Sequence, residues 1–92
     1  MRVTARGELD LAYAERLCSE VEALLERGFT DVVIDLRDLT FIDSSGVQAL
    51  LMCDRRARQA GGRLFVALAV GPVARTIELC GVRDLLDVVA SA

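Results

Sequence analysis

The stretch Phe41-Ile42-Asp43-Ser44-Ser45-Gly46-Val47 joins two segments of different character. Before it, Asp31–Leu36 is almost continuous Val and Ile, which is typical of a strand that is covered on both faces. After it, apolar residues recur at helical intervals from Ser44 to Ala60, and the pair Gly61-Gly62 is a helix-ending signal. The stretch therefore predicts a strand-to-helix connection, with two serine hydroxyls at the start of the helix.

The rest of the chain continues this alternation of strands and helices. Helical spacing marks Leu11 to about Glu26, and Pro72 opens a third helix that stops at Gly81. Further short strands are expected at Arg2–Arg6, Arg63–Leu68 and Leu85–Val89. Strands separated by single helices call for right-handed crossovers. We therefore predict one α/β domain over residues 1–92, with a mostly parallel central sheet of about four strands and three or more helices.

The composition excludes several classes of function. The chain has 92 residues, of which 53% are hydrophobic and 27% charged, as in an ordinary folded domain. Its net charge of −3 argues against nucleic-acid binding, which needs a basic surface. It contains neither histidine nor lysine, which excludes histidine-based catalysis, histidine-ligated metals and Schiff-base chemistry. We therefore expect no enzymatic activity, no metal site and no cofactor.

Three cysteines, Cys18, Cys53 and Cys80, are scattered without a paired spacing, and each falls among apolar neighbours in a predicted helix. We interpret them as buried free thiols, which suits a reducing cytoplasm. No apolar run approaches the roughly 20 residues that span a bilayer, and no secretory leader opens the chain. The sequence therefore predicts a cytoplasmic protein without membrane contact.

Two interpretations of Asp43-Ser44-Ser45 remain open. These residue types are preferred at helix N-termini, so they can serve simply as a cap. The same position also suits a negatively charged group, because the first backbone N–H groups of a helix have no partner within it. Gly46 favours the second interpretation, since glycine inside a helix costs up to ~1 kcal/mol relative to alanine. A site that needs another molecule close to the backbone would explain a glycine here.

Three carboxylates near the same strand end offer a further alternative. Asp35, Asp38 and Asp43 could form the magnesium-binding acidic pocket of a receiver domain. The lysine that such domains use is missing from this chain. We therefore rank this alternative below the other binding functions.

Four stretches carry a resemblance to a known family. They are Gly7-Glu8-Leu9-Asp10, Asp35-Leu36 with Asp38-Leu39-Thr40-Phe41, Ile42-Asp43-Ser44-Ser45-Gly46, and the Gly61-Gly62 turn. Together they resemble the bacterial STAS domain, and within it the anti-anti-sigma factors, also called anti-sigma factor antagonists. The resemblance runs from Arg2 to about Val89.

In that family the unphosphorylated protein binds a cytoplasmic anti-sigma factor that is also a serine kinase of the GHKL ATPase type, and binding releases a sigma factor. The kinase then phosphorylates the first serine of the Asp-Ser-Ser/Thr-Gly motif, and a PP2C-type phosphatase reverses the modification. The resemblance implies that Ser44 is the acceptor. It also implies that Asp43, Ser45 and Gly46 surround Ser44 at the partner-binding surface, with Asp10 at the same end of the sheet.

The N-terminus departs from the family pattern. The family usually has one more strand before Gly-Glu-Leu-Asp, and only six residues precede Gly7 in this sequence. Without that strand the sheet edge at Arg2–Arg6 would be uncovered. An uncovered edge favours weak self-association into a homodimer.

The family also contains members with other functions. The alternative for this chain is a STAS domain that uses the same surface without phosphorylation. Such a domain would be a scaffold of a stress-signalling assembly or a small subunit of a lipid-transport ATPase. An intact Ser44 favours the phospho-regulated antagonist but does not exclude this alternative.

Overall fold

The central element is a parallel sheet, in a computed structural model that describes residues 1–90. Its four strands lie in the order β1-β3-β5-β6, and each neighbouring pair is parallel. Their bounds are Arg2–Thr4 for β1, Asp31–Asp35 for β3, Arg63–Leu68 for β5 and Asp87–Ala90 for β6. The predicted α/β architecture with a mostly parallel central sheet is confirmed.

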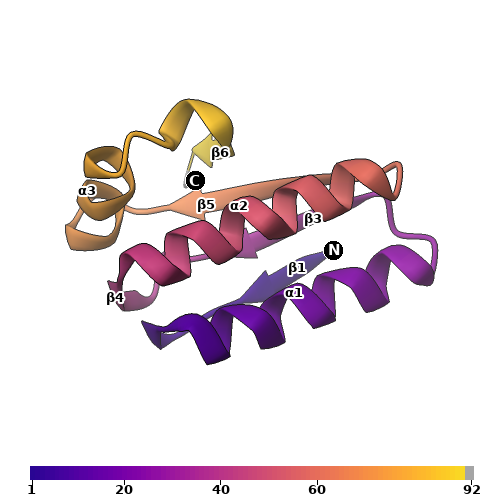
Figure 1. The fold of residues 1–92 in the computed structure, drawn as a ribbon, viewed down its shortest axis with the longest axis horizontal. Coiled ribbons are helices and arrows are strands. Elements are labelled where there is room, and N and C mark those ends of the chain that lie inside the picture. The colour runs from indigo at the N-terminus through magenta and orange to yellow at the C-terminus, as the bar shows by residue number, and fades with distance from the viewer. Residues whose placement is uncertain (91–92) are drawn as a thin grey trace.

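Two long helices cover one face of this sheet. α1 (Leu11–Glu26) and α2 (Ser44–Gln59) lie side by side in front of the strands (Figure 1). Both helices begin at the residues that the sequence pattern predicts. The core lies between them and the sheet, and its largest fully buried side chains are Leu9, Val21, Val32, Ile34, Leu36, Val47, Leu50, Leu64, Val66 and Ile77.

The third helix, α3 (Pro72–Leu79), packs against β4 (Leu39–Ile42) at one end of the molecule (Figure 1). A short 3-10 helix, η1 (Arg83–Leu85), follows it. The last strand therefore begins at Asp87 and not at Leu85 as predicted, because the residues before it form this helical turn. No helix in the described part of the chain is long and apolar enough to cross a membrane.

A second, two-stranded sheet was not predicted as a separate element. β2 (Gly7–Leu9) pairs in parallel with β4, and Leu9 lies opposite Ile42. Both strands are short and lie directly before a helix, so the sequence pattern does not distinguish them from loop connections. Their pairing places the start of α1 beside the start of α2.

The sheet is less completely enclosed than the Val/Ile run of β3 predicts. Val32 and Ile34 are fully buried on the face under the helices. Val33 points to the opposite face, where it lies beside Phe65 of β5, and both side chains are only half-buried. The prediction of cover on both faces is therefore wrong at Val33, because α1 and α2 both pack on the same side.

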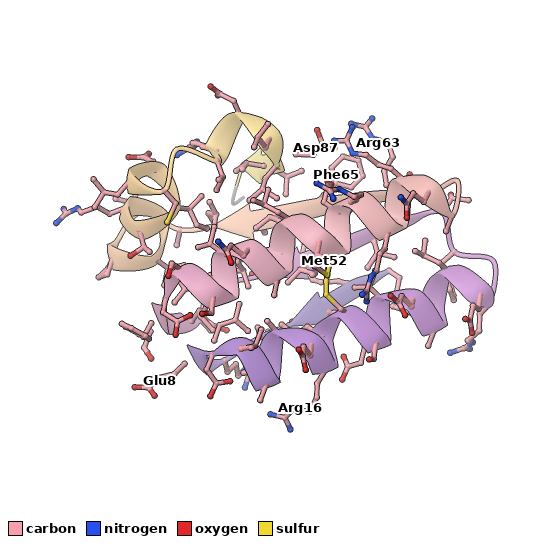
Figure 2. The ribbon with its side chains drawn as sticks, in the orientation of Figure 1. Glu8, Arg16, Met52, Arg63, Phe65 and Asp87 are labelled. Atoms are coloured by element: carbon pink, nitrogen blue, oxygen red, sulfur yellow. A yellow bond between two sulfur atoms is a disulfide. The ribbon has the colours of Figure 1, made fainter. Side chains whose placement is uncertain are left out.

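The cysteines differ from the prediction of three buried free thiols. Cys18 of α1 and Cys53 of α2 are buried, but they form a disulfide with Cα atoms 5.3 Å apart. Figure 2 shows a sulfur–sulfur bond between the two helices. Cys80, at the C-terminal end of α3, is free and exposed. The two bonded cysteines are 35 residues apart in the sequence, so no local spacing indicates their pairing. The pairing results from the packing of α1 against α2.

The edge strand β1 pairs only with β3 among the described residues. On either side of β1, the carbonyl of Met1 accepts from the N–H of Val33, and the N–H of Ala5 donates to the carbonyl of Asp35. The backbone groups of Arg2 and Thr4 therefore point to the other side of the strand, since neighbouring residues of a strand alternate. Self-association through this edge remains a prediction.

The buried carboxylate of Asp35, at the end of β3, binds two arginine side chains. Arg37 donates to Asp35 through its backbone N–H, its Nε at 2.9 Å and an Nη at 2.8 Å, and Arg2 of β1 donates at 2.8 Å. The Asp35 side chain is 7% exposed. The side-chain hydrogen bonds from Arg37 lower the pKa of Asp35 most, and the Arg37 backbone N–H and the Arg2 side chain lower it further. Burial raises this pKa, but the hydrogen bonds outweigh it and hold the pKa well below its usual range. The ionised form of Asp35 therefore stabilises the fold.

We expect Asp35→Asn to lower the free energy of unfolding by about 1.5–3 kcal/mol near neutral pH, because charged hydrogen bonds are lost. A depressed pKa adds stability above the unfolded-state pKa of about 3.9, and this stability is lost as the pH falls below that value. The difference from wild type should therefore shrink in urea unfolding at about pH 2.5 compared with about pH 7.

Asp38→Asn is the matched control, since that side chain is 64% exposed and its contact with Arg6 is 3.9 Å long. It should change stability by less than ~0.5 kcal/mol. An Asp35→Asn penalty that is the same at both pH values would contradict the assignment of an ionised, hydrogen-bonded Asp35.

Candidate functional site

Two similar strand-to-helix junctions lie side by side at one end of the sheet. After β2, the Asp10 carboxylate accepts a hydrogen bond from the N–H of Tyr13 at 2.9 Å and caps α1. After β4, the Asp43 carboxylate accepts from the N–H of Gly46 at 2.8 Å and caps α2. Because β2 and β4 pair, the two helix N-termini meet at the same surface (Figure 1). Asp10 thus lies at the same end as the serine motif, as the family resemblance implies.

Ser44 and Ser45 occupy the first two positions of α2, and both side chains are exposed. Asp43, which is half-buried, supplies the cap, so neither serine hydroxyl is needed for that purpose. The N–H groups at the start of a helix lack partners within it and form its positive end. The structure confirms that Ser44 is exposed at the N-terminus of the second helix, in a setting that favours a negative charge.

Gly46 is explained by packing inside the chain. It is buried, and a Cβ atom at this position would lie 2.6 Å from the carbonyl oxygen of Leu9 and 3.0 Å from the Ile42 side chain. The interpretation that Gly46 leaves room for another molecule is therefore wrong. The glycine lets α2 approach the backbone of β2, which fixes the position of the serine turn.

The surface around the serine turn combines acidic and apolar side chains. Phe41 is 52% exposed and Leu11 is 51% exposed, so each junction carries one large apolar residue in contact with solvent. Glu8, the neighbour of Phe41 across β2 and β4, is exposed at this end of the molecule (Figure 2). Sequence reasoning missed Phe41 and Leu11 as surface residues. In β4, Leu39 and Ile42 are buried while Thr40 and Phe41 are both exposed, so regular strand alternation would have placed Phe41 on the buried face of Leu39.

The three carboxylates of the magnesium alternative do not converge. Asp35 is held by two arginines, Asp38 contacts Arg6, and Asp43 caps α2. Among the described residues, no group of three or more Asp, Glu, Cys or His side chains is arranged to hold a metal ion. The receiver-domain interpretation therefore has no structural support.

Comparison with known proteins defines the family. The family model described as "Mlab, STAS domain" matches residues 1–87. A candidate anti-sigma factor antagonist of Bordetella bronchiseptica, BtrV, is 30% identical over 94% of this chain and 74% of its own length. The anti-sigma-B factor antagonist of Bacillus subtilis is 26% identical over 100% of this chain and 84% of its own length.

Solved structures share the fold. The anti-sigma factor antagonist SpoIIAA in its unphosphorylated form matches with a TM-score of 0.70 and 22% identity, over 99% of this chain and 79% of its own. The NMR structure of the protein TM1081 matches with a TM-score of 0.80 and 17% identity, over 98% and 73%. The chain belongs to the STAS domain family, within the group of anti-sigma factor antagonists, which are regulatory proteins and not enzymes.

We expect Gly46→Ala to destabilise the domain by about 1–3 kcal/mol, because the added methyl group would collide with the Leu9 carbonyl. In an unobstructed helix the same change would stabilise by up to ~1 kcal/mol, so the sign of the effect tests the packing. Chemical unfolding provides the measurement. Gln48→Ala, an exposed position in the same helix, should stay within ~0.5 kcal/mol of wild type. A Gly46→Ala variant more stable than wild type would contradict the close approach of α2 to β2.

Proposed function

We propose that this chain acts in the cytoplasm as an anti-sigma factor antagonist that binds its anti-sigma factor through the Ser44 surface and loses that affinity when Ser44 is phosphorylated. The anti-sigma factor is then also the serine kinase, of the GHKL type, and a PP2C-type phosphatase restores binding. The observation that carries this proposal is the exposed Ser44 at the first position of α2, with Asp43 already serving as the cap.

The local electrostatics support a phosphate on Ser44. A phosphoserine adds about −1.5 to −2 charges near neutral pH. At Ser44 these charges lie over unpaired N–H groups and the positive end of the helix dipole, which favours them. The neighbouring carboxylate of Asp43 opposes them, but solvent screens exposed charges. The isolated domain should therefore tolerate the phosphate.

The likeness to SpoIIAA supports the same conclusion. That protein has been solved in its unphosphorylated and in its phosphorylated form, and this chain matches each with a TM-score of 0.70. Both forms therefore share the overall fold of this chain, with and without the phosphate. By analogy, the effect of phosphate here lies at the partner interface and not in the fold.

The side chains around Ser44 explain why added charge would weaken binding. Leu11 and Phe41 offer apolar contact area, whereas Glu8 and Asp10 are exposed carboxylates beside it. A partner that packs on this surface removes water from the serine turn. A phosphate there must then be desolvated, or must lie beside groups of like charge. Dissociation follows without any change in the domain itself.

The first test concerns the acceptor residue. Incubation with the cognate anti-sigma kinase and ATP should place one phosphate on Ser44, as mapped by mass spectrometry, because Ser44 is exposed and matches the acceptor position of the family. Ser45→Ala, at the next helical position, should still be modified, whereas Ser44→Ala should not. Phosphate on Ser45 in the Ser44→Ala variant would show that the acceptor is misassigned. Binding without any modification would favour the alternative of a scaffold or transporter subunit.

The second test distinguishes an effect of charge on partner binding from an effect of charge on the stability of the domain. Ser44→Asp should melt close to wild type, since a negative charge at a helix N-terminus changes stability by only a few tenths of a kcal/mol. Its affinity for the anti-sigma factor should fall by about 2–5 kcal/mol, roughly thirtyfold to several-thousandfold, if the turn is desolvated on binding. Ser44→Ala should bind like wild type. Calorimetric titrations and melting curves of the three proteins decide between a charge effect and unfolding, and a Ser44→Asp variant that binds normally would contradict the proposed switch.

A further inference from the structure

The bond between Cys18 and Cys53 is a covalent link between the two helices that carry the junctions. The two residues are 35 positions apart, and their side chains are 5% and 2% exposed. α1 and α2 otherwise pack through apolar side chains and one ion pair between Arg56 and Glu22. The disulfide therefore adds a covalent constraint on the relative position of these helices.

The surroundings of Cys18 suit the reduced state as well. Its sulfur lies 3.5 Å from the carbonyl oxygen of Ala49 in α2, within the distance at which a thiol can donate a hydrogen bond. A disulfide sulfur has no hydrogen, so this contact gains a donor only when the bond is reduced. Both oxidation states can thus be accommodated by the same packing.

Both cysteines are buried, but only Cys18 lines a groove on the surface. A groove of about 430 Å³ runs between α1 and α2, and its lining includes Cys18 together with Ser45, Ala49 and Met52. Met52 lies on the side of α2 that faces α1 (Figure 2). Cys53 does not line this groove. A reagent in this groove would therefore lie next to Cys18 and not next to Cys53.

We propose that Cys18 and Cys53 form a reversible dithiol–disulfide pair, in which Cys18 reacts first with a small-molecule disulfide and Cys53 resolves the product. The Cys18 thiolate attacks one sulfur of the reagent, a mixed disulfide forms on Cys18, and one reagent thiolate leaves. The Cys53 thiolate then attacks the Cys18 sulfur and expels the second reagent thiolate. Two protein thiols are oxidised and one reagent disulfide is reduced to two thiols. This inference does not depend on the proposed function of Ser44.

Oxidised glutathione is the probe, in a Cys80→Ser background that removes the exposed third thiol. The folded, reduced protein should lose both thiols and form the Cys18–Cys53 bond, as mapped by peptide mass spectrometry. Cys53→Ser should stop at a glutathione adduct on Cys18. Cys18→Ser should leave Cys53 unmodified in the folded state, which circular dichroism verifies. Equal modification of Cys53 in that variant, or a folded parent that remains a dithiol, would overturn the proposal.

Melting curves test the link without relying on the single variants. The oxidised parent should melt roughly 10–25 °C above the reduced parent, because the bond closes a long loop in the unfolded chain. Dithiothreitol should restore the lower melting temperature. A double Cys18→Ala/Cys53→Ala variant in the same background should be insensitive to both reagents. Identical melting of the oxidised and reduced parent would show that no constraint forms between the helices.

Discussion

The parallel pairing of β2 with β4 and the approach of α2 to the Leu9 carbonyl together fix the position of the serine turn. The pairing aligns the ends of two short strands, and Asp10 and Asp43 then start a helix from each of them. Gly46 permits the approach because a side chain would collide with the β2 backbone. Ser44 is consequently presented from a turn that is held by a cap, a strand pair and a buried glycine. Such a turn is suited to receive a charge without moving.

The rest of the domain holds this arrangement in place. α1 and α2 pack on one face of the parallel sheet and are joined through Cys18 and Cys53. At the end of β3, Asp35 binds Arg2 and Arg37 and so connects the edge strand to the turn before β4. A partner-dependent switch needs no second conformation in this design. Under the proposed function, phosphorylation of Ser44 would change the surface charge and leave the framework beneath it unchanged.

Much of the fold can be predicted from the sequence because its signals are local. The first residues of α1 and α2, Leu11 and Ser44, can be predicted from the capping aspartates before them. The helical periodicity and the Val/Ile run of β3 identify the helix layer and the sheet layer. What could not be predicted depends on contacts between distant residues. The β2–β4 pairing, the Cys18–Cys53 bond and the Leu9 carbonyl next to Gly46 all arise only when the chain is folded. Gly46 is an example: the sequence identifies it as an unfavourable residue within a helix, but the reason for it, the close approach to the Leu9 carbonyl, is visible only in the fold.

In the proposed switch, phosphate on Ser44 acts on a preformed, rigid surface. Amide NMR spectra of the domain before and after phosphorylation by its kinase would reveal any change in the fold. We expect chemical-shift changes only at the two junctions, around Asp43–Val47 and Asp10–Tyr13, while the resonances of β5, β6 and α3 remain in place. Changes that spread through β5 and α3 would contradict it, because they would show that the modification acts by reorganising the fold.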